Sequence, residues 1–495
     1  MLERILPFFQ RTRKSTPVET LNPSLREGPW PDRLRLCQLS ASNTDAITLT
    51  DAKTGVLITG KTGSGKTSGP GRLFAKAYLR AGFGGLVLCY KTDEADLWRS
   101  LLKQTGREQD GIFFGEDNTH CFNFLDYEAR VSGADLAENV VNLMLELARV
   151  TNPGVRGGEN AEFWQAERKK LLRNILGLLL PVDGSVDLLR MNSLLNSAPH
   201  DFTQARSSDW RASSILYKYL VSAEQLIAQN KIRKHEYQLI ADYWLHEHPG
   251  DDPRTRGNIV ADYTGMMDAF LRGKIYDLFC QTTTVSPDDI LAGKVVVVAL
   301  PVASYHEVGR YAAGVWKYLL QRASERRSLV RPETIRPTFI WADEAQYFCT
   351  STDQSFQTTA RSSRVCTVFL TQNVPNFYVE FGGTEAGKHR VHSLLGNLAI
   401  KIFCGNDDSV TNHWASETID KSTQYKINVG NAQELGRDSI GLSEHEEFDC
   451  PSRNFLGLKF GTEQNDYIVE AIGFQGGRVW SNDRRWMKCS FRQNY

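Results

Sequence analysis

The sequence predicts an α/β fold with a mostly parallel sheet and an inserted all-α domain. Short apolar runs with strand character alternate with segments of helical periodicity in both the first and the last parts of the chain. Between them, residues 130 to about 290 carry apolar positions at helical spacing, with no convincing strand. The length of 495 residues allows about three domains, or one large domain that carries an insertion.

The composition is that of an ordinary globular protein. Hydrophobic residues make up 41% and charged residues 23% of the chain, which excludes a disordered chain, a collagen and a small scaffold that needs disulfides. Lys plus Arg and Asp plus Glu each number 58, so the formal net charge is zero. A uniformly basic coat is therefore excluded, and any contact with nucleic acid must come from local patches.

Neither a membrane span nor a disulfide framework is expected. The longest apolar runs, 175–182 and 295–303, are shorter than the roughly 18 residues that a bilayer requires. The N-terminus lacks the pattern of a signal peptide, and the nine cysteines are scattered without Cys-x-x-Cys spacing. We therefore expect a cytoplasmic protein with no integral membrane segment, which would reach the inner membrane through partners.

Strands and helices alternate in the first part of the chain. Residues 1–45 are polar and irregular and are predicted to be an N-terminal arm. Two short strands are expected from Ile47 and Gly55, and a buried strand from Gly85. Helices are expected over about 69–81 and 94–104. This order is typical of a parallel sheet covered by helices.

Further strands are expected after the helical segment, at 294–300, 338–342, 365–370 and 398–403, with a hairpin-like stretch at 454–460 and 466–471. The predicted domains are the arm 1–45, a nucleotide-binding domain from 46–128 and 289–475, an all-α insertion over 129–288, and a tail over 476–495.

Residues 60–67 match in full the phosphate-binding pattern G-x-x-x-x-G-K-[ST], between an expected strand and an expected helix. Glycines let backbone N–H groups turn toward phosphate oxygens, and the helix N-terminus adds partial positive charge. Lys66 is expected to reach the β- and γ-phosphates, and Thr67 to ligate Mg²⁺. A chance glycine-rich turn is the alternative. The predicted nucleotide-binding residues are Gly60, Lys61, Thr62, Gly63, Ser64, Gly65, Lys66, Thr67 and Ser68.

An acidic pair follows the expected strand 338–342. We expect Asp343 to hold Mg²⁺ through water and Glu344 to act as the general base that polarises the attacking water. The pair favours hydrolysis of ATP over phosphoryl transfer to a small acceptor. A capping Asp-Glu at a strand-to-helix turn is the alternative. ATP and Mg²⁺ are the expected ligands.

Three further polar residues are candidates for the site. Gln372 follows the strand 365–370 and is expected to sense the γ-phosphate or orient water, unless it is an ordinary strand-end amide. Arg361 and Arg364 precede that strand. An arginine at a subunit edge can stabilise transition-state charge in a neighbour's site. Arg361 is the preferred candidate, and a solvated basic turn is the alternative. The predicted catalytic residues are thus Lys66, Glu344, Gln372 and Arg361.

The long separation between Lys66 and Asp343 exceeds that of compact kinases and GTPases and leaves room for the helical insertion. The sequence therefore predicts a RecA-like P-loop NTPase core. With these motifs in place, the chain resembles the TraG/TraD-like coupling-protein ATPases of conjugation and type IV secretion, within the FtsK- and HerA-like ring motors. The resemblance covers about residues 50–425.

The resemblance depends on short segments that occur in the family's order: Tyr90–Glu94, Phe122–Leu125, Phe163–Trp164 with Leu171–Leu172, Asp343–Ala345, Ala360–Arg361, Thr371–Asn373 and Leu395–Asn397. The chain departs from the family at Tyr90, Phe124 and Glu167, where Asp, Pro and Ala are usual, and after Ile419, where a glycine is usual. The N-terminal transmembrane helices of many relatives are also missing from this sequence.

The resemblance implies a homohexameric ring with ATP at subunit interfaces, DNA of either strandedness in a central channel, and relaxase and secretion-channel proteins as partners. The basic stretches 231–235 and 322–331, with Tyr217, Tyr219 and Tyr237, are candidates for DNA contact, although such stretches are more often solvated helix faces. Two alternatives stay open: a related motor in DNA processing or defence, and a nucleotide-gated docking platform without processive translocation.

Overall fold

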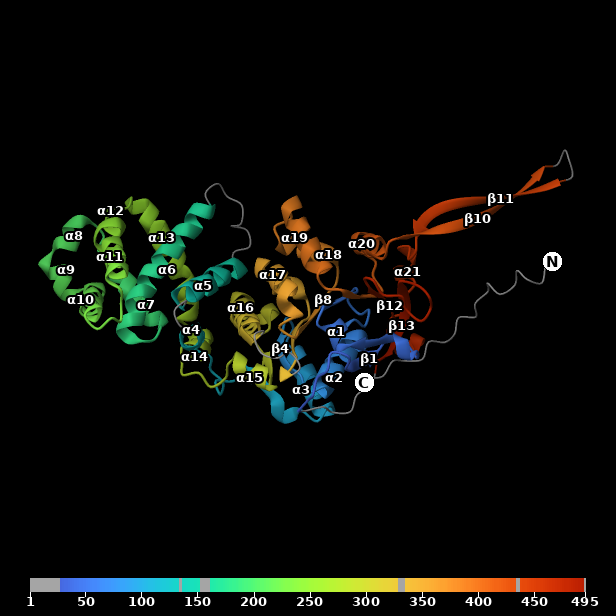
Figure 1. Ribbon diagram of the computed structural model, residues 1–495, viewed down its shortest axis with the longest axis horizontal. Coiled ribbons are helices and arrows are strands. Elements are labelled where there is room, and N and C mark those ends of the chain that lie inside the picture. Colours follow the sequence, from blue (N-terminus) through green and yellow to red (C-terminus); the bar gives the residue numbers. More distant parts are fainter. Residues whose placement is uncertain (1–26, 133–135, 152–160, 328–333, 433–436, 494–495) are drawn as a thin grey trace. The chain divides into compact units, whose positions relative to one another are not determined.

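The computed structural model describes residues 27–132, 136–151, 161–327, 334–432 and 437–493 (Figure 1). The chain divides into two compact units. Unit 1 combines residues 1–85, 97–110 and 324–495, and unit 2 combines residues 86–96 and 111–323. Each unit is therefore built from segments that are far apart in the sequence.

The core of unit 1 is a sheet of buried strands. Its strands lie in the order β13 (Trp486–Arg492), β12 (Ile468–Gln475), β9 (Ile400–Cys404), β3 (Val56–Thr59), β8 (Val365–Thr371) and β7 (Thr338–Ala342). Strands β9, β3, β8 and β7 are parallel, while β12 runs antiparallel to both β9 and β13. The four parallel strands are buried at every position, which is why they appear in the sequence as continuous apolar runs.

The parallel register brings the carboxyl ends of these strands to one edge of the sheet. Thr59 at the end of β3 pairs with Thr371 on β8 and with Phe403 on β9, and Ala342 at the end of β7 pairs with Phe369. The loops that follow β3, β7, β8 and β9 therefore meet at this edge, where ligands usually bind in open α/β sheets.

The helices of unit 1 are α1 (Leu49–Ala52), α2 (Arg72–Arg80), α17 (Ser351–Ala360), α18 (Val374–Glu380), α19 (Glu385–Gly396), α20 (Ser409–Ile419) and α21 (Arg453–Leu456). Helix α3 (Glu94–Gln104) begins in unit 2 and continues in unit 1. Phe339 on β7 stacks with Tyr78 of α2 and Trp98 of α3, at centroid distances of 5.8 and 5.6 Å. These two aromatic contacts pack α2 and α3 against β7.

Unit 2 contains the parallel pair β5 (Gly111–Phe114) and β6 (Val295–Val298), and β4 (Gly84–Leu88) spans the boundary between the units. Every described element between β5 and β6 is helical, as the periodicity predicts: α4 (Phe124–Ser132), α5 (Leu136–Thr151), α6 (Ala161–Asp183), α7 (Leu188–Asn196), α8 (Phe202–Arg206), α9 (Ser208–Ser213), α10 (Ile215–Ile227), α11 (Lys234–Asp242), α12 (His248–Gly250), α13 (Pro253–Phe270), α14 (Gly273–Phe279) and α15 (Pro287–Ala292). Helix α16 (Val302–Arg326) follows β6. The exact domain boundaries stay a prediction.

The two ends of the chain differ from the expected arm and tail. Strand β1 (Arg35–Gln38) pairs antiparallel with β2 (Ala46–Thr48), and the side chains of Leu36 and Cys37 are buried. Residues 486–492 form the edge strand β13 instead of a tail. Strand β13 mixes buried and exposed positions, as an edge strand does, whereas β1 has only four residues and does not stand out from its polar neighbours.

The expected hairpin of 454–460 with 466–471 is wrong. Residues 453–456 form helix α21, whose Phe455 packs against Phe403, and β12 pairs with β9 and β13 instead. A long hairpin lies earlier, where β10 (Lys421–Ala432) pairs with β11 (Arg437–Phe448) over twelve residues each (Figure 1). No helix in the described part of the chain is long and apolar enough to cross a bilayer.

Candidate active site

The phosphate-binding loop connects β3 to one π-helical turn, η2 (Thr67–Gly71), which continues into α2. Gly63 and Gly65 have φ of 78° and 83°, a region that favours glycine. A side chain at Gly65 would also collide with Val469, since a Cβ atom there would lie 2.3 Å from Cγ2 of that valine. At Gly63, by contrast, the space is open. The loop thus has the glycine-dependent shape that the motif predicts.

Thr67 and Asp343, the two predicted metal ligands, lie side by side. The Thr67 hydroxyl donates a hydrogen bond of 2.8 Å to Oδ2 of Asp343, and the Glu344 amide donates one of 2.9 Å to Oδ1. Both carboxylate oxygens of this buried aspartate are therefore held in place. A hydroxyl beside a carboxylate is a set of oxygen ligands that suits Mg²⁺. The residues present thus fit the predicted magnesium ion.

Glu344 is held from several sides at once. Its side chain has only 1% of its surface exposed, and its backbone lies in the left-handed region with φ 50°. Lys66 Nζ lies 3.6 Å from Oε1, and the Gln372 amide donates to the same oxygen at 3.0 Å. Strained non-glycine backbone of this kind persists only where the surroundings over-determine it. The structure therefore brings together Lys66, Glu344 and Gln372, three of the four predicted catalytic residues.

Gln346 is a site residue that the sequence analysis missed. Its amide donates to Oε2 of Glu344 at 3.0 Å, and its Oε1 accepts a bond of 2.9 Å from the Thr371 hydroxyl. Gln346 is buried in the turn η9 (Ala345–Tyr347), so it bridges the ends of β7 and β8. The only sequence signal is a polar amide two positions after the predicted base, in a segment that is otherwise apolar.

The C-terminal strand pair also contacts the phosphate-binding loop. Gln493, just after β13, donates a hydrogen bond to the Ser68 hydroxyl, and Val469 of β12 lies against Gly65. Lys61 pairs with Asp407 at 2.6 Å and lies over the ring of Phe460. These contacts were not predictable, since the segment after residue 425 carried no recognisable motif.

Arg361 and Arg364 lie at the other edge of the sheet. Arg364 is buried, donates to the backbone carbonyl of Trp30 and lies 3.4 Å from Asp32. The pKa of Asp32 is lowered, chiefly by its hydrogen bond with Lys53 and also by both arginines. Arg361 is exposed at the end of α17. The seven residues of β8, roughly 23 Å of strand, separate it from Gln372. Arg361 is therefore not part of the site in its own chain, and its role in a neighbour's site stays a prediction.

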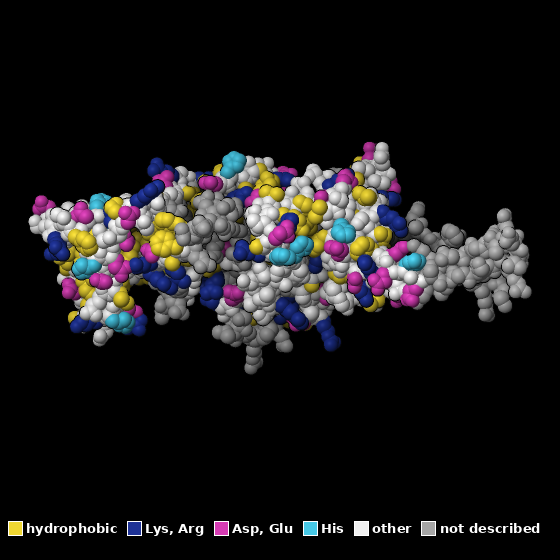
Figure 2. All heavy atoms as spheres, turned by 90° about the horizontal axis from the view of Figure 1, so that it is seen from above, with side chains coloured by type: hydrophobic (Ala, Val, Ile, Leu, Met, Phe, Trp, Pro, Cys, Tyr) yellow, Lys and Arg dark blue, Asp and Glu magenta, His cyan; other side chains and the backbone are white. Residues whose placement is uncertain are grey.

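The basic stretches are partly engaged within the chain. In 231–235, Arg233 pairs with Glu236. In 322–331, of which residues 328–333 lie outside the described residues, Arg327 donates to Thr338 at 3.0 Å, and burial lowers the pKa of this guanidinium to about 10. On the face drawn in Figure 2, basic and acidic side chains are interspersed. The Tyr219 hydroxyl donates to Asp183 at 2.7 Å. No DNA-binding surface is thereby established.

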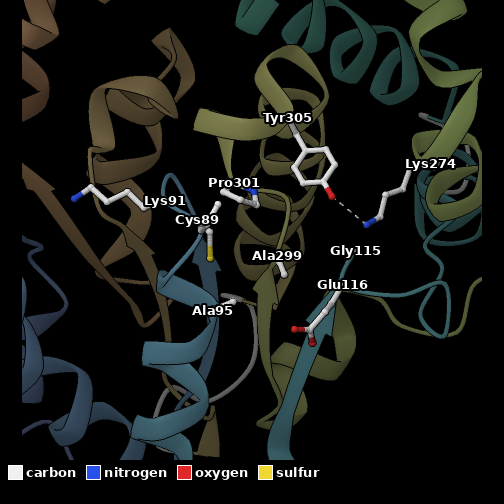
Figure 3. A pocket seen from close by; sticks show the side chains of 10 residues that line it. Cys89, Lys91, Ala95, Gly115, Glu116, Lys274, Ala299, Pro301 and Tyr305 are labelled. Atoms are coloured by element: carbon white, nitrogen blue, oxygen red, sulfur yellow. Dashed lines mark hydrogen bonds between the residues drawn. The ribbon is translucent and has the colours of Figure 1, made fainter.

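The segment 90–94, which carries part of the family resemblance, forms a tight turn in unit 2. The Tyr90 and Lys91 amides donate to the Glu94 carboxylate at 2.9 and 3.3 Å. Beside this turn, Lys91, Lys274 and Tyr305 line a cavity of about 170 Å³ (Figure 3). Lys274 and the Tyr305 hydroxyl point toward one another, 3.5 Å apart. The turn therefore has a structural role in holding the start of α3.

One family model matches the sequence. Residues 337–447 match the family described as the TraM recognition site of TraD and TraG. The matched segment contains Asp343, Glu344, Gln346 and Gln372, and it ends within the long hairpin β10–β11. No curated protein matches the chain significantly.

Solved structures match nearly the whole chain. The bacterial conjugative coupling protein TrwB, in its unbound form lacking 70 N-terminal residues, has a TM-score of 0.60 at 12% identity and covers 98% of this chain and 94% of its own. TrwB with ADP and Mg²⁺ has a TM-score of 0.57 at 13% identity, with coverage of 98% and 95%. VirB4 of Thermoanaerobacter pseudethanolicus has a TM-score of 0.50 at 12% identity and 89% coverage of each chain.

The sheet, the phosphate-binding loop and these matches define a RecA-like P-loop fold, as the sequence predicted. Within that fold class, the resemblance to the coupling-protein ATPases of conjugation and type IV secretion is confirmed by the family model over residues 337–447. Over nearly the whole chain, the likeness to TrwB is one of fold.

Proposed function

We propose that this protein hydrolyses ATP and uses the energy to move DNA, or a nucleoprotein substrate, toward a secretion or conjugation channel. One observation carries the proposal: Glu344 is held between Lys66 and Gln372, beside the Thr67–Asp343 pair. A buried carboxylate next to the lysine of a phosphate-binding loop is positioned to act as a base on water near the γ-phosphate.

Nucleotide binding is expected to use the open side of the loop. No atom lies within 4 Å of a Cβ position built at Gly63, so a phosphate group has room to approach the loop there. Lys66 would move from Glu344 to the β- and γ-phosphates. Thr67 and Asp343 would hold Mg²⁺, which neutralises charge on the phosphates when it is bound.

Once Lys66 has moved to the phosphates, hydrolysis would depend on the Glu344 carboxylate. Gln372 donates to Oε1 of Glu344 and lies at the end of β8, so its amide can orient water toward the phosphate. Glu344 would accept the proton that this water loses as its oxygen attacks the γ-phosphorus, while the bond from that phosphorus to the bridging oxygen breaks and ADP leaves. Gln346 keeps hold of the other carboxylate oxygen during this step.

Assembly into a homohexamer on DNA is part of the proposal. It is supported by the fold shared with the coupling protein TrwB and by the exposed position of Arg361, which is free to reach a neighbouring copy. Relaxase and channel proteins would be the partners, and any association with the inner membrane would run through them.

The test is steady-state ATP hydrolysis by the purified protein, with and without single- and double-stranded DNA, at several protein concentrations and one stated salt concentration. We expect hydrolysis to rise with DNA and to rise steeply with protein concentration, because Arg361 would act between copies. Lys66→Ala should abolish the activity. DNA-stimulated hydrolysis at the wild-type rate in Lys66→Ala would rule out the site.

A second candidate is favoured by the description of the matched family segment as a recognition site for a partner protein. In that case the protein would be a nucleotide-gated docking platform that recruits substrates without processive translocation. This candidate predicts slow turnover that is indifferent to DNA, and no displacement of a protein roadblock bound to DNA.

A further inference from the structure

The helical part of unit 2 contains a cavity of about 280 Å³ that shares no residue with the nucleotide site. It lies between the end of α7, the following turn, α12 and the first turns of α13, and is lined by Leu195, Asn196, Ala198, His200, His248, Pro253, Arg256, Gly257 and Val260. The lining combines an apolar surface with one guanidinium and two imidazoles, and it includes no carboxylate.

Arg256 brings a permanent positive charge to this cavity. Its Nη1 donates to the backbone carbonyls of His248 and Asp251, at 3.1 and 3.3 Å. Those two bonds use only Nη1, and Arg256 lines the cavity.

His248 is the second notable group. Only 4% of its surface is exposed, and its ring packs against the rings of Tyr243 and Trp244, at centroid distances of 5.9 and 5.3 Å. The same residue lines the cavity, so a ligand there would lie within reach of the imidazole. Burial, followed by Arg256 and His200, lowers the pKa of His248 to about 4, so the ring is neutral near pH 7.

We infer that this cavity binds a small carboxylate attached to a short apolar group. Arg256 would pair with the carboxylate, since guanidinium and carboxylate form two parallel hydrogen bonds. His248 would donate a ring N–H to the same ligand, and Leu195, Ala198 and Val260 would contact its apolar part. The volume lies near the lower end of ligand sites, about 300 Å³, which suits a ligand the size of one amino acid.

Gly257 provides a way to block the cavity. It is exposed and lines the cavity from α13, and a Cβ atom built there has no neighbour within 4 Å, so a larger side chain fits at the wall of the cavity. Gly265 lies on the same helix with equally open space, but it does not line the cavity. Gly257→Leu and Gly265→Leu are therefore a matched pair, because both replace an exposed helical glycine and only one of them lies at the cavity wall.

The experiment measures binding of N-acetyl-leucine to the full-length protein by calorimetry, and the histidine ring signals by NMR. N-acetyl-leucinamide, which has the same shape without the charge, is the control ligand. We expect the acid to bind and to shift the His248 signal, and the amide to bind at least tenfold more weakly. Gly257→Leu should lose binding of the acid, and Gly265→Leu should keep it.

Arg256→Gln should weaken binding of the acid at least tenfold. Because this change also removes bonds to the backbone, folding is checked by circular dichroism, and Gly257→Leu decides the matter if Arg256→Gln is unfolded.

A tripeptide that ends in leucine separates the two sources of the carboxylate: binding of the tripeptide indicates a chain terminus, and binding of N-acetyl-leucine alone indicates a free acid. Equal binding of acid and amide, or full binding by Gly257→Leu, would overturn the inference. The outcome does not depend on ATP hydrolysis.

Discussion

Glu344 in unit 1 and His248 in unit 2 are both buried polar side chains, but their surroundings differ. Each carboxylate oxygen of Glu344 accepts a hydrogen bond from a glutamine, and Lys66 lies nearby. His248 packs against two aromatic rings and lines a cavity. Hydrogen bonds within the chain already offset the desolvation of the Glu344 carboxylate, whereas the hydrogen bond proposed for His248 is one to a ligand.

The difference predicts two kinds of response to a ligand. At Glu344 a nucleotide must compete for Lys66, so binding and catalysis are linked through the exchange of partners. At His248 the proposed ligand needs only to enter the cavity.

The largest effect is expected for Glu344→Gln. The amide has nearly the same shape but cannot accept the proton from water, so kcat should fall by about 100- to 10,000-fold. Nucleotide binding should be kept, because Lys66 loses a competing charge. Single-turnover hydrolysis and equilibrium binding of ATP measure the two quantities separately. A kcat close to that of the wild type would mean that Glu344 is not the base.

The next effect concerns the pH dependence of stability. The pKa of His248 is lowered from 6.5 to about 4 in the folded chain. Between these values the unfolded state binds more protons than the folded state, so stability should fall as pH falls through this window. The full loss is about 3 kcal/mol.

Urea unfolding at pH 4 to 7 measures this loss, and His248→Phe should reduce the slope. His246, which is exposed two positions earlier and pairs with Asp242, is the matched control. If His246→Phe flattened the curve as much as His248→Phe did, the dependence would not come from the buried ring.

A smaller effect is expected for Gln346→Ala, which removes one of the two amides that hold Glu344. The loss of one hydrogen bond to a charged group corresponds to about 1.5 kcal/mol, or roughly a tenfold fall in kcat with little change in KM. Gln354→Ala is the control, since that amide donates to Ser393 on α19 outside the site. Equal losses of kcat in both variants would indicate a general loss of stability and no positioning role.

The smallest effect compares the two glycines of α13. Gly257→Leu and Gly265→Leu should each stabilise the protein by up to about 1 kcal/mol, because leucine has the higher helix propensity. Gly257→Leu should gain more, since its side chain also covers apolar lining of the cavity. Thermal unfolding measures both. A lower melting temperature for Gly257→Leu would show that the cavity cannot take the side chain.

Much of the fold was predictable because it depends on local patterns. The buried strands β3, β7, β8 and β9 are continuous apolar runs, and the phosphate-binding loop is a contiguous motif. The edge strand β13 was not predicted, since it mixes buried and exposed positions and gives only a weak signal, and β1 was missed because it has only four residues. The hairpin assignment failed for a related reason: residues 453–456 are apolar enough for a strand, yet they pack as a helical turn.

The fold class and most of the chemical groups at the candidate site could be predicted from the amino-acid sequence alone. Lys66, Thr67, Asp343, Glu344 and Gln372 could be named because each follows or ends a recognisable element. The partners of those groups are visible only in the tertiary structure. It showed that Gln346 holds Glu344, that Arg364 is buried while Arg361 is exposed, and that His248 and Arg256 share a cavity. Such contacts depend on strand register and helix packing between residues that are distant in the chain, and no local pattern encodes them.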